Sequence, residues 1–311
     1  MCDVVPSSTR YIVVAQPIAE AIAARRPVVA LETTLVTHGF PHPKGVEISA
    51  KLEAAVAAEG AQPATIGVVD GQIRVGLDHS EVEQLATCAR VTKLNVSNLA
   101  AHLLPGSWGS TTVATTILVA KRAGIRIIAT GGIGGVHRNV LETGDISADI
   151  TALARFPVAV VCAGAKAVLD LPRTCEMLET LGVPVFGFET DEFPAFYSRE
   201  SGLRVDARFD NIEALAGAVR MHFALETGTG VVVANPIARE HELSPAVWQP
   251  AIERALADAA RQGIRGREVT PFLLERLRAL TEGASAFSNE ALLIGNARLA
   301  ARLAAALQRS D

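Results

Sequence analysis

The sequence predicts a layered α/β protein built on a mainly parallel mixed sheet and completed by a helical C-terminal region. Apolar runs alternate with segments of helical periodicity from residue 27 to residue 235, a pattern typical of parallel strands joined by helices. Asp70-Gly71 lies between two short apolar segments and indicates one antiparallel hairpin. After Pro236 only helical patterns remain. Because the 311 residues contain no repeat, low-complexity stretch or Pro/Gly-rich linker, we expect a single domain over 1–311.

Short runs of Val, Ile, Leu and Ala between turn residues predict the strands. The first is the apolar segment 27–31 and the last is 230–235. The two arms of the hairpin are 64–69 and 72–75. The remaining strands are expected at 91–96, 125–130, 157–163 and 183–188.

Helical spacing of apolar residues, together with start and stop signals, predicts the helices. Gly60 ends a helix over 43–59, and Gly124 ends a helix over 110–123. Ser80 and Glu83 have the spacing of a capping box, so a helix is expected to begin at Ser80. The other helices are expected at 150–155, 172–181, 211–227, 245–262, 270–281 and 289–308.

The composition excludes several classes of protein. Hydrophobic residues make up 49% and charged residues 20%, which excludes a disordered or fibrous chain. With a formal charge of −4 and 5% aromatic residues, we expect no nucleic-acid partner. Four cysteines without a Cys-x-x-Cys pair argue against a disulfide framework or a zinc ribbon. Because no signal segment or long apolar stretch is found, we expect a cytoplasmic protein without membrane contact.

Lys166 is the strongest single candidate for a functional residue. Ligands of such sheets bind beyond the carboxyl ends of the strands, and Lys166 follows the strand 157–163 among small or apolar residues. The chain has 24 arginines and only five lysines, so a lysine here suggests that an amine is required. A desolvated amine with a lowered pKa could form an imine with a masked aldehyde. The alternative is a lysine that extends out of the sheet end into solvent.

Other polar residues also follow predicted strands. Glu32 comes directly after 27–31, and it could be a general acid or base with a pKa raised by partial burial, or a cap. Lys93 could hold a phosphate or carboxylate, or it could be a solvated lysine at the sheet edge. Asn235 and Asn289 could each bond a polar ligand or cap a helix.

Two loops have the composition of anion-binding segments. The residues Gly-Ser-Thr-Thr at 109–112 would offer hydroxyls and bare amides at a helix N-terminus. Thr130 and the glycine-rich segment 131–135 follow a strand, and we expect a ligand to approach this loop closely. The loop lacks the third glycine of a nicotinamide fingerprint. Arg138 beyond it is an anion ligand or simply a loop cation.

Two carboxylates and a hydroxyl gather just before a short predicted helix. Asp145 and Asp149 flank Ser147, and such hard oxygens suit a metal ion or sugar hydroxyls, although Ser147 or Asp149 could instead cap the helix. The acidic and aromatic segment 189–197 could be a lid or a solvated loop. We expect Cys162 to be a small buried hydrophobe rather than a nucleophile.

Taken together, these segments resemble the pseudouridine-5'-phosphate glycosidase family, also called the indigoidine synthase A-like family. The motifs ATGGIGGVHR, DISAD and CAGAK, read together, are the most specific part of the likeness. The likeness departs after Lys93, where the family usually has an Arg/Asp-rich stretch and this chain has Leu-Asn-Val-Ser-Asn. The matching segments run in order at 30–43, 63–77, 109–116, 129–138, 145–150, 160–171, 182–197, 231–237 and 270–277.

The resemblance implies a reversible reaction in which pseudouridine 5'-phosphate and water give uracil and ribose 5-phosphate. It also implies a manganese-dependent, cytoplasmic homotrimer with a three-layer α/β/α fold. Lys166 matches the nucleophile, Glu32 the proton donor and Asp145 the ligand of one Mn²⁺ per subunit, held mostly through water. By the same resemblance, Lys93, Val113, Ser147, Ala148 and Asp149 match substrate contacts. From their positions after strands or near helix N-termini, we also expect contacts from Thr112, Thr130 and Asn289.

Two other classes of function remain open at this point. A class-I-aldolase-like lyase would also use Lys166 to form a Schiff base, but with the carbonyl of another sugar phosphate. A non-catalytic sugar-phosphate sensor would keep the anion-binding loops without needing Lys166 as an amine.

Overall fold

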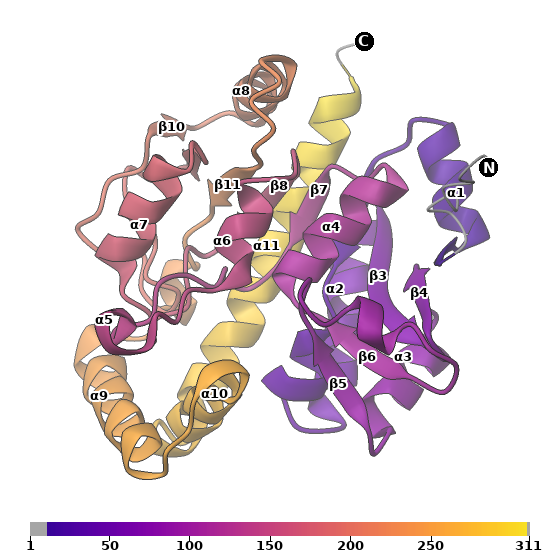
Figure 1. Cartoon of the computed structure of the whole chain (residues 1–311). Coiled ribbons are helices and arrows are strands. Elements are labelled where there is room, and N and C mark those ends of the chain that lie inside the picture. Colours follow the sequence, from indigo (N-terminus) through magenta and orange to yellow (C-terminus); the bar gives the residue numbers. More distant parts are fainter. Residues whose placement is uncertain (1–10, 310–311) are drawn as a thin grey trace, which may run out of the picture.

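The computed structural model describes residues 11–309, and it has the three-layer architecture that the sequence predicts (Figure 1). Its strands form one eleven-stranded mixed sheet with the order β1-β4-β3-β2-β7-β8-β11-β9-β10, to which β6 and then β5 are joined through β3. Only the pairs β3–β4 and β3–β6 are antiparallel among the strands of these residues. The strands are β1 (Ile12–Val14), β2 (Val28–Leu31), β3 (Gln62–Val69), β4 (Gln72–Val75), β5 (Val91–Leu94), β6 (Trp108–Thr111), β7 (Ile127–Ala129), β8 (Ala159–Cys162), β9 (Val185–Phe188), β10 (Ala207–Phe209) and β11 (Val231–Ala234).

Helices cover both faces of the sheet. The long C-terminal helix α11 packs against α2 and α8 in one layer, and α4 packs against α6 in the other (Figure 1). The C-terminal region is helical, as expected, and α9 and α10 pack against each other. The helices are α1 (Gln16–Ala23), α2 (Lys44–Ala58), α3 (His79–Thr87), α4 (Val113–Ala123), α5 (Val140–Thr143), α6 (Ala148–Leu153), α7 (Leu171–Thr180), α8 (Ile212–Ala224), α9 (Pro245–Arg261), α10 (Val269–Leu280) and α11 (Ala284–Gln308), with short turns η2 (Leu35–Gly39), η3 (Ala100–His102), η4 (Arg239–His241) and η5 (Gly266–Glu268).

The expected helix over 110–123 is wrong at its beginning. Ser110 and Thr111 belong to strand β6, and α4 begins only at Val113. The amide of Thr111 donates to Thr33 Oγ1 at 2.9 Å, and its hydroxyl donates to the carbonyl of Ile66 at 2.7 Å. The Thr111 hydroxyl therefore bonds the neighbouring strand β3, whereas Ser110 Oγ accepts a hydrogen bond from the Thr37 hydroxyl at 2.8 Å. The sequence pattern did not distinguish these roles from helix capping.

Helix α3 begins one residue before the expected position. Its capping box is formed by Asp78 and Glu81 rather than by Ser80 and Glu83, because the Glu81 amide donates to Asp78 Oδ1 at 2.8 Å. The reciprocal bond runs from the Asp78 amide to Glu81 Oε2 at 3.0 Å. The strands β1, β6 and β10 and the helix α1 were not expected from the sequence.

The segment 189–197 is neither a lid nor a solvated loop. Phe193, Phe196 and Tyr197 are all buried, with at most 2% of each residue exposed. The Glu192 carboxylate accepts hydrogen bonds from two backbone amides of the following turn, at 2.9 and 2.7 Å. Glu192 therefore stabilises a turn, while the aromatic residues join the core.

Candidate active site

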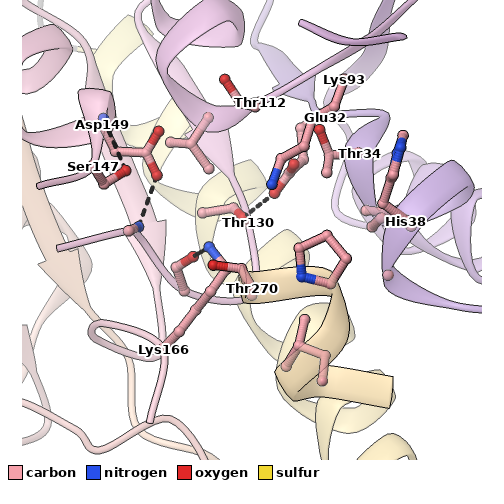
Figure 2. A pocket seen from close by; sticks show the side chains of 18 of the residues that line it. Glu32, Thr34, His38, Lys93, Thr112, Thr130, Ser147, Asp149, Lys166 and Thr270 are labelled. Carbon is pink, nitrogen blue, oxygen red and sulfur yellow. Dashed lines mark hydrogen bonds between the residues drawn. The ribbon is translucent and has the colours of Figure 1, made fainter. Parts of the chain in front are cut away.

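A cavity of about 330 Å³ lies beyond the carboxyl ends of β2, β7 and β8 (Figure 2). Because parallel strands end at the same edge of the sheet, residues far apart in the sequence meet there. The structure brings most of the residues that the sequence singled out to this one cavity, with Asn235 and Arg138 as the exceptions. Those that line the cavity are Glu32, Lys93, Thr112, Val113, Thr130, Asp145, Ser147, Ala148, Asp149, Lys166 and Asn289.

Glu32 is a buried carboxyl group, only 8% exposed, at the end of β2. The Thr130 hydroxyl donates to Glu32 Oε1 at 2.5 Å. Burial raises the pKa of Glu32 above its usual value, while the nearby positive charge of Lys166 opposes that shift. The Glu32 carboxyl group therefore bonds a cavity residue rather than the backbone of a helix end, which disfavours the interpretation of Glu32 as a cap.

Lys166 points into the same cavity (Figure 2). Its Nζ donates to the carbonyl of Gly132 at 2.7 Å, so the amine is held inside rather than extending away from the sheet. Gly164, two residues earlier, has φ of +77°, and a Cβ there would lie 2.0 Å from the carbonyl oxygen of Pro194. Glycine is thus required for the turn that brings Lys166 from β8 to the cavity.

The glycine-rich loop 131–135 is approached closely by other parts of the chain, in addition to lining the cavity at which a ligand is expected. A Cβ on Gly132 would lie 2.6 Å from the Phe196 ring, and one on Gly134 would lie 2.1 Å from Ser147 Oγ. The glycines are therefore needed for internal packing. Gly131, Gly132 and Gly134 nonetheless line the cavity.

Asp149 replaces the external anion that the sequence predicts at the N-terminus of α4. Its carboxylate is 5% exposed and accepts the Ala114 amide on Oδ1 at 2.8 Å and the Gly134 amide on Oδ2 at 2.7 Å. Thr112 is the N-cap of α4, accepting from the Thr115 amide at 3.4 Å. The chain's own carboxylate thus complements this helix terminus and fixes α4 to the glycine-rich loop.

Ser147 and Asp145 have different roles in the local structure. Ser147 caps α6, because its Oγ accepts the Asp149 amide at 3.2 Å. Asp145 Oδ2 lies 3.8 Å from His137 Nε2, and the Asp145 side chain is 28% exposed. Within residues 11–309, no three Asp, Glu, His or Cys side chains converge to hold a metal. This donor set fits a hard cation bound through one carboxylate, with water as its other ligands, and does not fit a closed protein cage.

Two histidines that were not among the expected site residues, His38 and His137, also line the cavity. Burial lowers the pKa of His38, and it also lowers the pKa of His137 against the opposing effect of Asp145. The positive charge of Lys93, on β5, lowers both pKa values further. His38 lies in η2, seven residues after β2, and His137 lies eight residues after β7, so no local pattern singled them out. The cavity is also lined by Gly266 of η5 and by three residues of α10, namely Thr270, Pro271 and Leu274.

The two candidate asparagines separate in the structure. Asn289, on α11, lines the cavity, whereas Asn235 Nδ2 donates to Asn296 Oδ1 at 2.9 Å. Asn296 in turn donates to the backbone carbonyls of Thr130 and Gly131, at 2.8 and 3.2 Å. Asn296 was missed by the sequence analysis, and it joins α11 to the strand end that carries Thr130.

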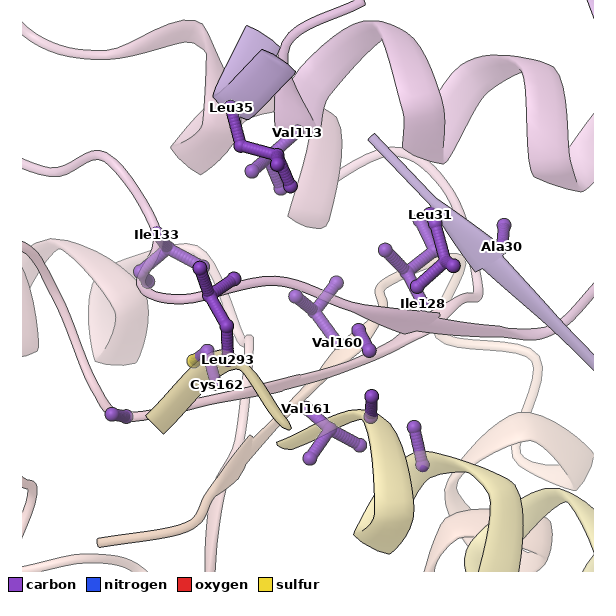
Figure 3. Close-up of a cluster of buried hydrophobic side chains, with 14 of the residues drawn as sticks. Ala30, Leu31, Leu35, Val113, Ile128, Ile133, Val160, Val161, Cys162 and Leu293 are labelled. Atoms are coloured by element: carbon purple, nitrogen blue, oxygen red, sulfur yellow. The ribbon is translucent and has the colours of Figure 1, made fainter. Parts of the chain in front are cut away.

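The hydrophobic layer beneath the cavity contains Ile133, Cys162 and Leu293, which lie together in Figure 3. Cys162 is fully buried, and burial raises the pKa of its thiol to about 12. It is therefore a core residue, as expected. Arg138 donates to the carbonyl of Ala167 at 3.1 Å and so connects two loops of the site.

Comparison with known proteins identifies the family. The family model described as "Indigoidine synthase A like protein" matches residues 17–306. The chain belongs to the indigoidine synthase A-like family. Members with solved structures include an indigoidine synthase A-like protein from Thermotoga maritima, with a TM-score of 0.87 and 33% identity over 96% of this chain and 97% of that one.

Several relatives of known name cover nearly the whole chain. A pseudouridine-5'-phosphate glycosidase from Methylobacterium nodulans is 53% identical over 94% of this chain and 87% of its own length. One from Paracoccus denitrificans is 52% identical over 93% and 95%, respectively. The crystal structure of the prealnumycin C-glycosynthase AlnA, in complex with ribulose 5-phosphate, has a TM-score of 0.88 and 38% identity over 96% of this chain and 97% of that one.

Proposed function

We propose that this enzyme reversibly cleaves the C–C glycosidic bond of pseudouridine 5'-phosphate, giving uracil and ribose 5-phosphate through an imine on Lys166. The observation that carries the proposal is the meeting of the Lys166 amine and the Glu32 carboxyl, whose pKa burial raises, in one cavity. The names of relatives about 50% identical over most of the chain support the reaction. A sugar-phosphate complex of a C-glycosynthase with the same fold supports the class of substrate.

In the cleavage direction, Lys166 Nζ attacks C1' of the ribose and displaces the ring oxygen, and the proton that the new C–N ammonium loses passes to that oxygen. The nitrogen lone pair then forms the C=N bond of a protonated imine as Glu32 donates a proton to C5 and the C1'–C5 bond breaks, which completes uracil. Water adds to the protonated imine, and ribose 5-phosphate leaves as the aldehyde, restoring the amine and releasing the proton that returns to Glu32. The ordinary two-carboxylate mechanism does not serve, because the atom that leaves is a carbon rather than an oxygen.

The other cavity residues are proposed to hold the substrate in position. Lys93 supplies a positive charge suited to the phosphate. Thr112, Val113, Thr130 and Asn289 line the wall around Glu32 and Lys166 and would restrict the ribose. Ser147, Ala148 and Asp149 are proposed as further substrate contacts, and the side chains of Ser147 and Asp149 also maintain local structure.

Asp145 is proposed to hold one Mn²⁺ per subunit, with water as the remaining ligands. When bound, such an ion would supply positive charge that stabilises oxygen anions of the substrate. We further propose that the protein acts in the cytoplasm as a homotrimer. In the part of the chain that the structure describes, no helix combines the length and apolar character needed to cross a membrane.

The direct test is incubation of the protein with uracil, ribose 5-phosphate and Mn²⁺, followed by detection of the C-glycoside. Formation of pseudouridine 5'-phosphate that depends on both substrates supports the proposal. An aldolase-like enzyme would instead turn over sugar phosphates in the absence of uracil. A sensor would bind the sugar phosphate without turnover, and a Lys166→Arg variant would bind it equally well.

A further inference from the structure

A second cavity, of about 310 Å³, lies at the other end of the sheet from the candidate active site. Its walls include Val28 and Ile127, the first residues of β2 and β7, whereas the active-site cavity lies beyond the carboxyl ends of these strands. Helix α11 passes both cavities, with Asn289 at one and Leu307 at the other. These two residues are separated by 18 positions, roughly 27 Å along a helix. The second cavity is therefore a separate place in the fold.

Four arginines line this second cavity. Arg25 and Arg26 follow α1, Arg126 precedes β7, and Arg220 lies on α8. No acidic side chain of residues 11–309 lines it. In a chain whose formal charge is −4, this concentration of guanidinium groups without carboxylates creates a local field that attracts anions.

Three of these arginines are not engaged by carboxylates elsewhere in the described part of the chain. Arg26, Arg126 and Arg220 take part in none of the ion pairs there, whereas Arg74 and Arg276, for example, are each paired with a carboxylate. Within residues 11–309, the positive charges of these three arginines are therefore not neutralised by ion pairing with an acidic residue. A ligand with more than one negative charge is the natural complement.

Two of the guanidinium groups are already oriented. The Arg126 guanidinium carbon lies 5.5 Å from the centre of the Phe223 ring, and stacking on a ring leaves the N–H edges available. Arg220 Nη1 donates to the carbonyl of Ala306 at 3.1 Å. A guanidinium has five N–H donors, so this single bond leaves donors for a ligand.

The backbone at the cavity also has an unusual conformation. Arg25 has φ of +51°, directly after the C-cap of α1, where glycine is the usual residue. The conformation is unfavourable for an L residue with a side chain. It is held by bonds from the Arg25 amide to the Ile22 carbonyl at 3.0 Å and from the Arg26 amide to the Ala21 carbonyl at 2.7 Å. The chain thus keeps an arginine at a position where glycine would fit more easily.

We propose that this cavity binds a small phosphorylated anion at a site distinct from the candidate active site. Phosphate matches the fork geometry of several guanidinium groups at once, which a monocarboxylate does not. Apolar walls from Ile22, Ile125 and Leu307 suit the organic part of a phosphate ester. The volume, about ten times the share of one water in the liquid, accommodates a phosphate with a small organic group.

The test is isothermal titration calorimetry of the full chain with inorganic phosphate, pyrophosphate and glycerol 3-phosphate. The variants are Arg126→Gln combined with Arg220→Gln, the active-site variant Lys93→Gln, and Arg302→Gln. Arg302 is the matched control, because its guanidinium also lies over a phenyl ring, 5.6 Å from Phe188, but does not line the cavity.

We expect at least one probe to bind, and the double variant to weaken the binding about tenfold or more, the cost of losing a charged hydrogen bond. Arg302→Gln and Lys93→Gln should retain it. If the double variant does not fold, Arg126→Lys takes its place in the test. This variant keeps the charge but loses the planar guanidinium, and it should also bind the probe more weakly. Preference for glycerol 3-phosphate over both inorganic probes would identify an organic ester as the ligand. Failure of all three probes to bind, unchanged affinity in a folded double variant, or loss of all binding in Lys93→Gln would overturn the proposal. None of these measurements depends on glycosidase activity.

Discussion

The Thr130 hydroxyl donates a 2.5 Å hydrogen bond to Glu32 Oε1, and so joins the residues that follow two adjacent parallel strands. The strand register explains the pairing, because Leu31 of β2 lies opposite Ala129 of β7. Glu32 and Thr130 are therefore neighbours at the sheet edge, where Lys166 also arrives from beyond β8. The bond fixes one carboxyl oxygen and leaves the other for the substrate.

Glu32→Gln should retain substrate binding and lose turnover, because the amide preserves the shape of the side chain but cannot transfer a proton. General acid–base catalysis is worth about 10²- to 10⁴-fold, and we expect a fall in kcat within that range. Steady-state kinetics would show KM changed by less than about threefold. Thr130→Val should lower kcat less, since the carboxyl group remains. If kcat of Glu32→Gln falls by less than about threefold, Glu32 does not transfer the proton and only positions the substrate.

The raised pKa of Glu32 predicts a pH-dependent stability difference between the wild type and Glu32→Gln. The folded protein disfavours the ionised carboxylate, so the wild type loses stability as the pH rises from about 4.5 through the raised pKa. Gln cannot ionise, so Glu32→Gln should gain in Tm relative to the wild type over the same pH interval. Thermal melts at constant ionic strength would measure the difference. Glu59→Gln, at an exposed position, controls for the change in net charge. If the Tm of Glu32→Gln minus the Tm of the wild type stays constant or falls as the pH rises, the burial argument is contradicted.

Chelation should abolish activity, and Mn²⁺ should restore it, if Asp145 supports the proposed cation. Asp145→Asn removes the charged ligand, so the Mn²⁺ concentration needed for half-maximal activity should rise by about tenfold or more. Glu142→Gln is the matched control, because Glu142 is exposed on the neighbouring helix α5 and does not line the cavity. Full activity after exhaustive chelation, with no bound metal by elemental analysis, would exclude the assignment.

Gly134→Ala should destabilise the protein and reduce activity together. The added Cβ would lie 2.1 Å from Ser147 Oγ and 2.9 Å from Asp149 Oδ2, so both side chains must move. Overpacking of this kind costs about 1–3 kcal/mol, which a chemical denaturation curve would measure. Gly217→Ala is the control, because the nearest atom to its Cβ is 3.9 Å away and alanine favours the helix by up to about 1 kcal/mol. Equal stability of the two variants would show that the loop has room to adjust.

The sequence alone predicted that the site residues meet, because of the way parallel strands are arranged. Parallel strands end at a common edge, so Glu32, Thr130 and Lys166 could be placed there without knowing the strand order. The hairpin at Asp70-Gly71 was predicted for a local reason, the turn type that this dipeptide favours, and β3 and β4 pair as expected.

What the sequence did not predict depends on long-range contacts. Asn296 bonds the carbonyl of Thr130 across 166 positions of sequence, and no local pattern indicates such a partner. The hydroxyls of Ser110 and Thr111 suit a helix cap as well as a strand, and only pairing with β3 distinguishes the two. The sequence did not show that Gly132 and Gly134 also serve internal packing, because that role depends on the positions of Phe196 and Ser147.

Lys166 as the covalent nucleophile is the central claim of the proposed mechanism. Its amine lies in the cavity with Glu32 and is held by the Gly132 carbonyl at 2.7 Å. Borohydride reduces an imine to a stable amine, so it should trap the sugar on the protein during turnover with ribose 5-phosphate. Lys166→Ala should remove both trapping and turnover while the fold persists, since truncation of a lysine beside a cavity removes little packing.

The most direct measurement is therefore peptide mass mapping of the enzyme after borohydride treatment in the presence of ribose 5-phosphate. We predict a reduced sugar-phosphate adduct on the peptide that contains Lys166, absent from Lys166→Ala and from enzyme treated without substrate. Lys93 lines the same cavity and provides the internal comparison. An adduct located on Lys93, or full activity in Lys166→Arg, would contradict the mechanism.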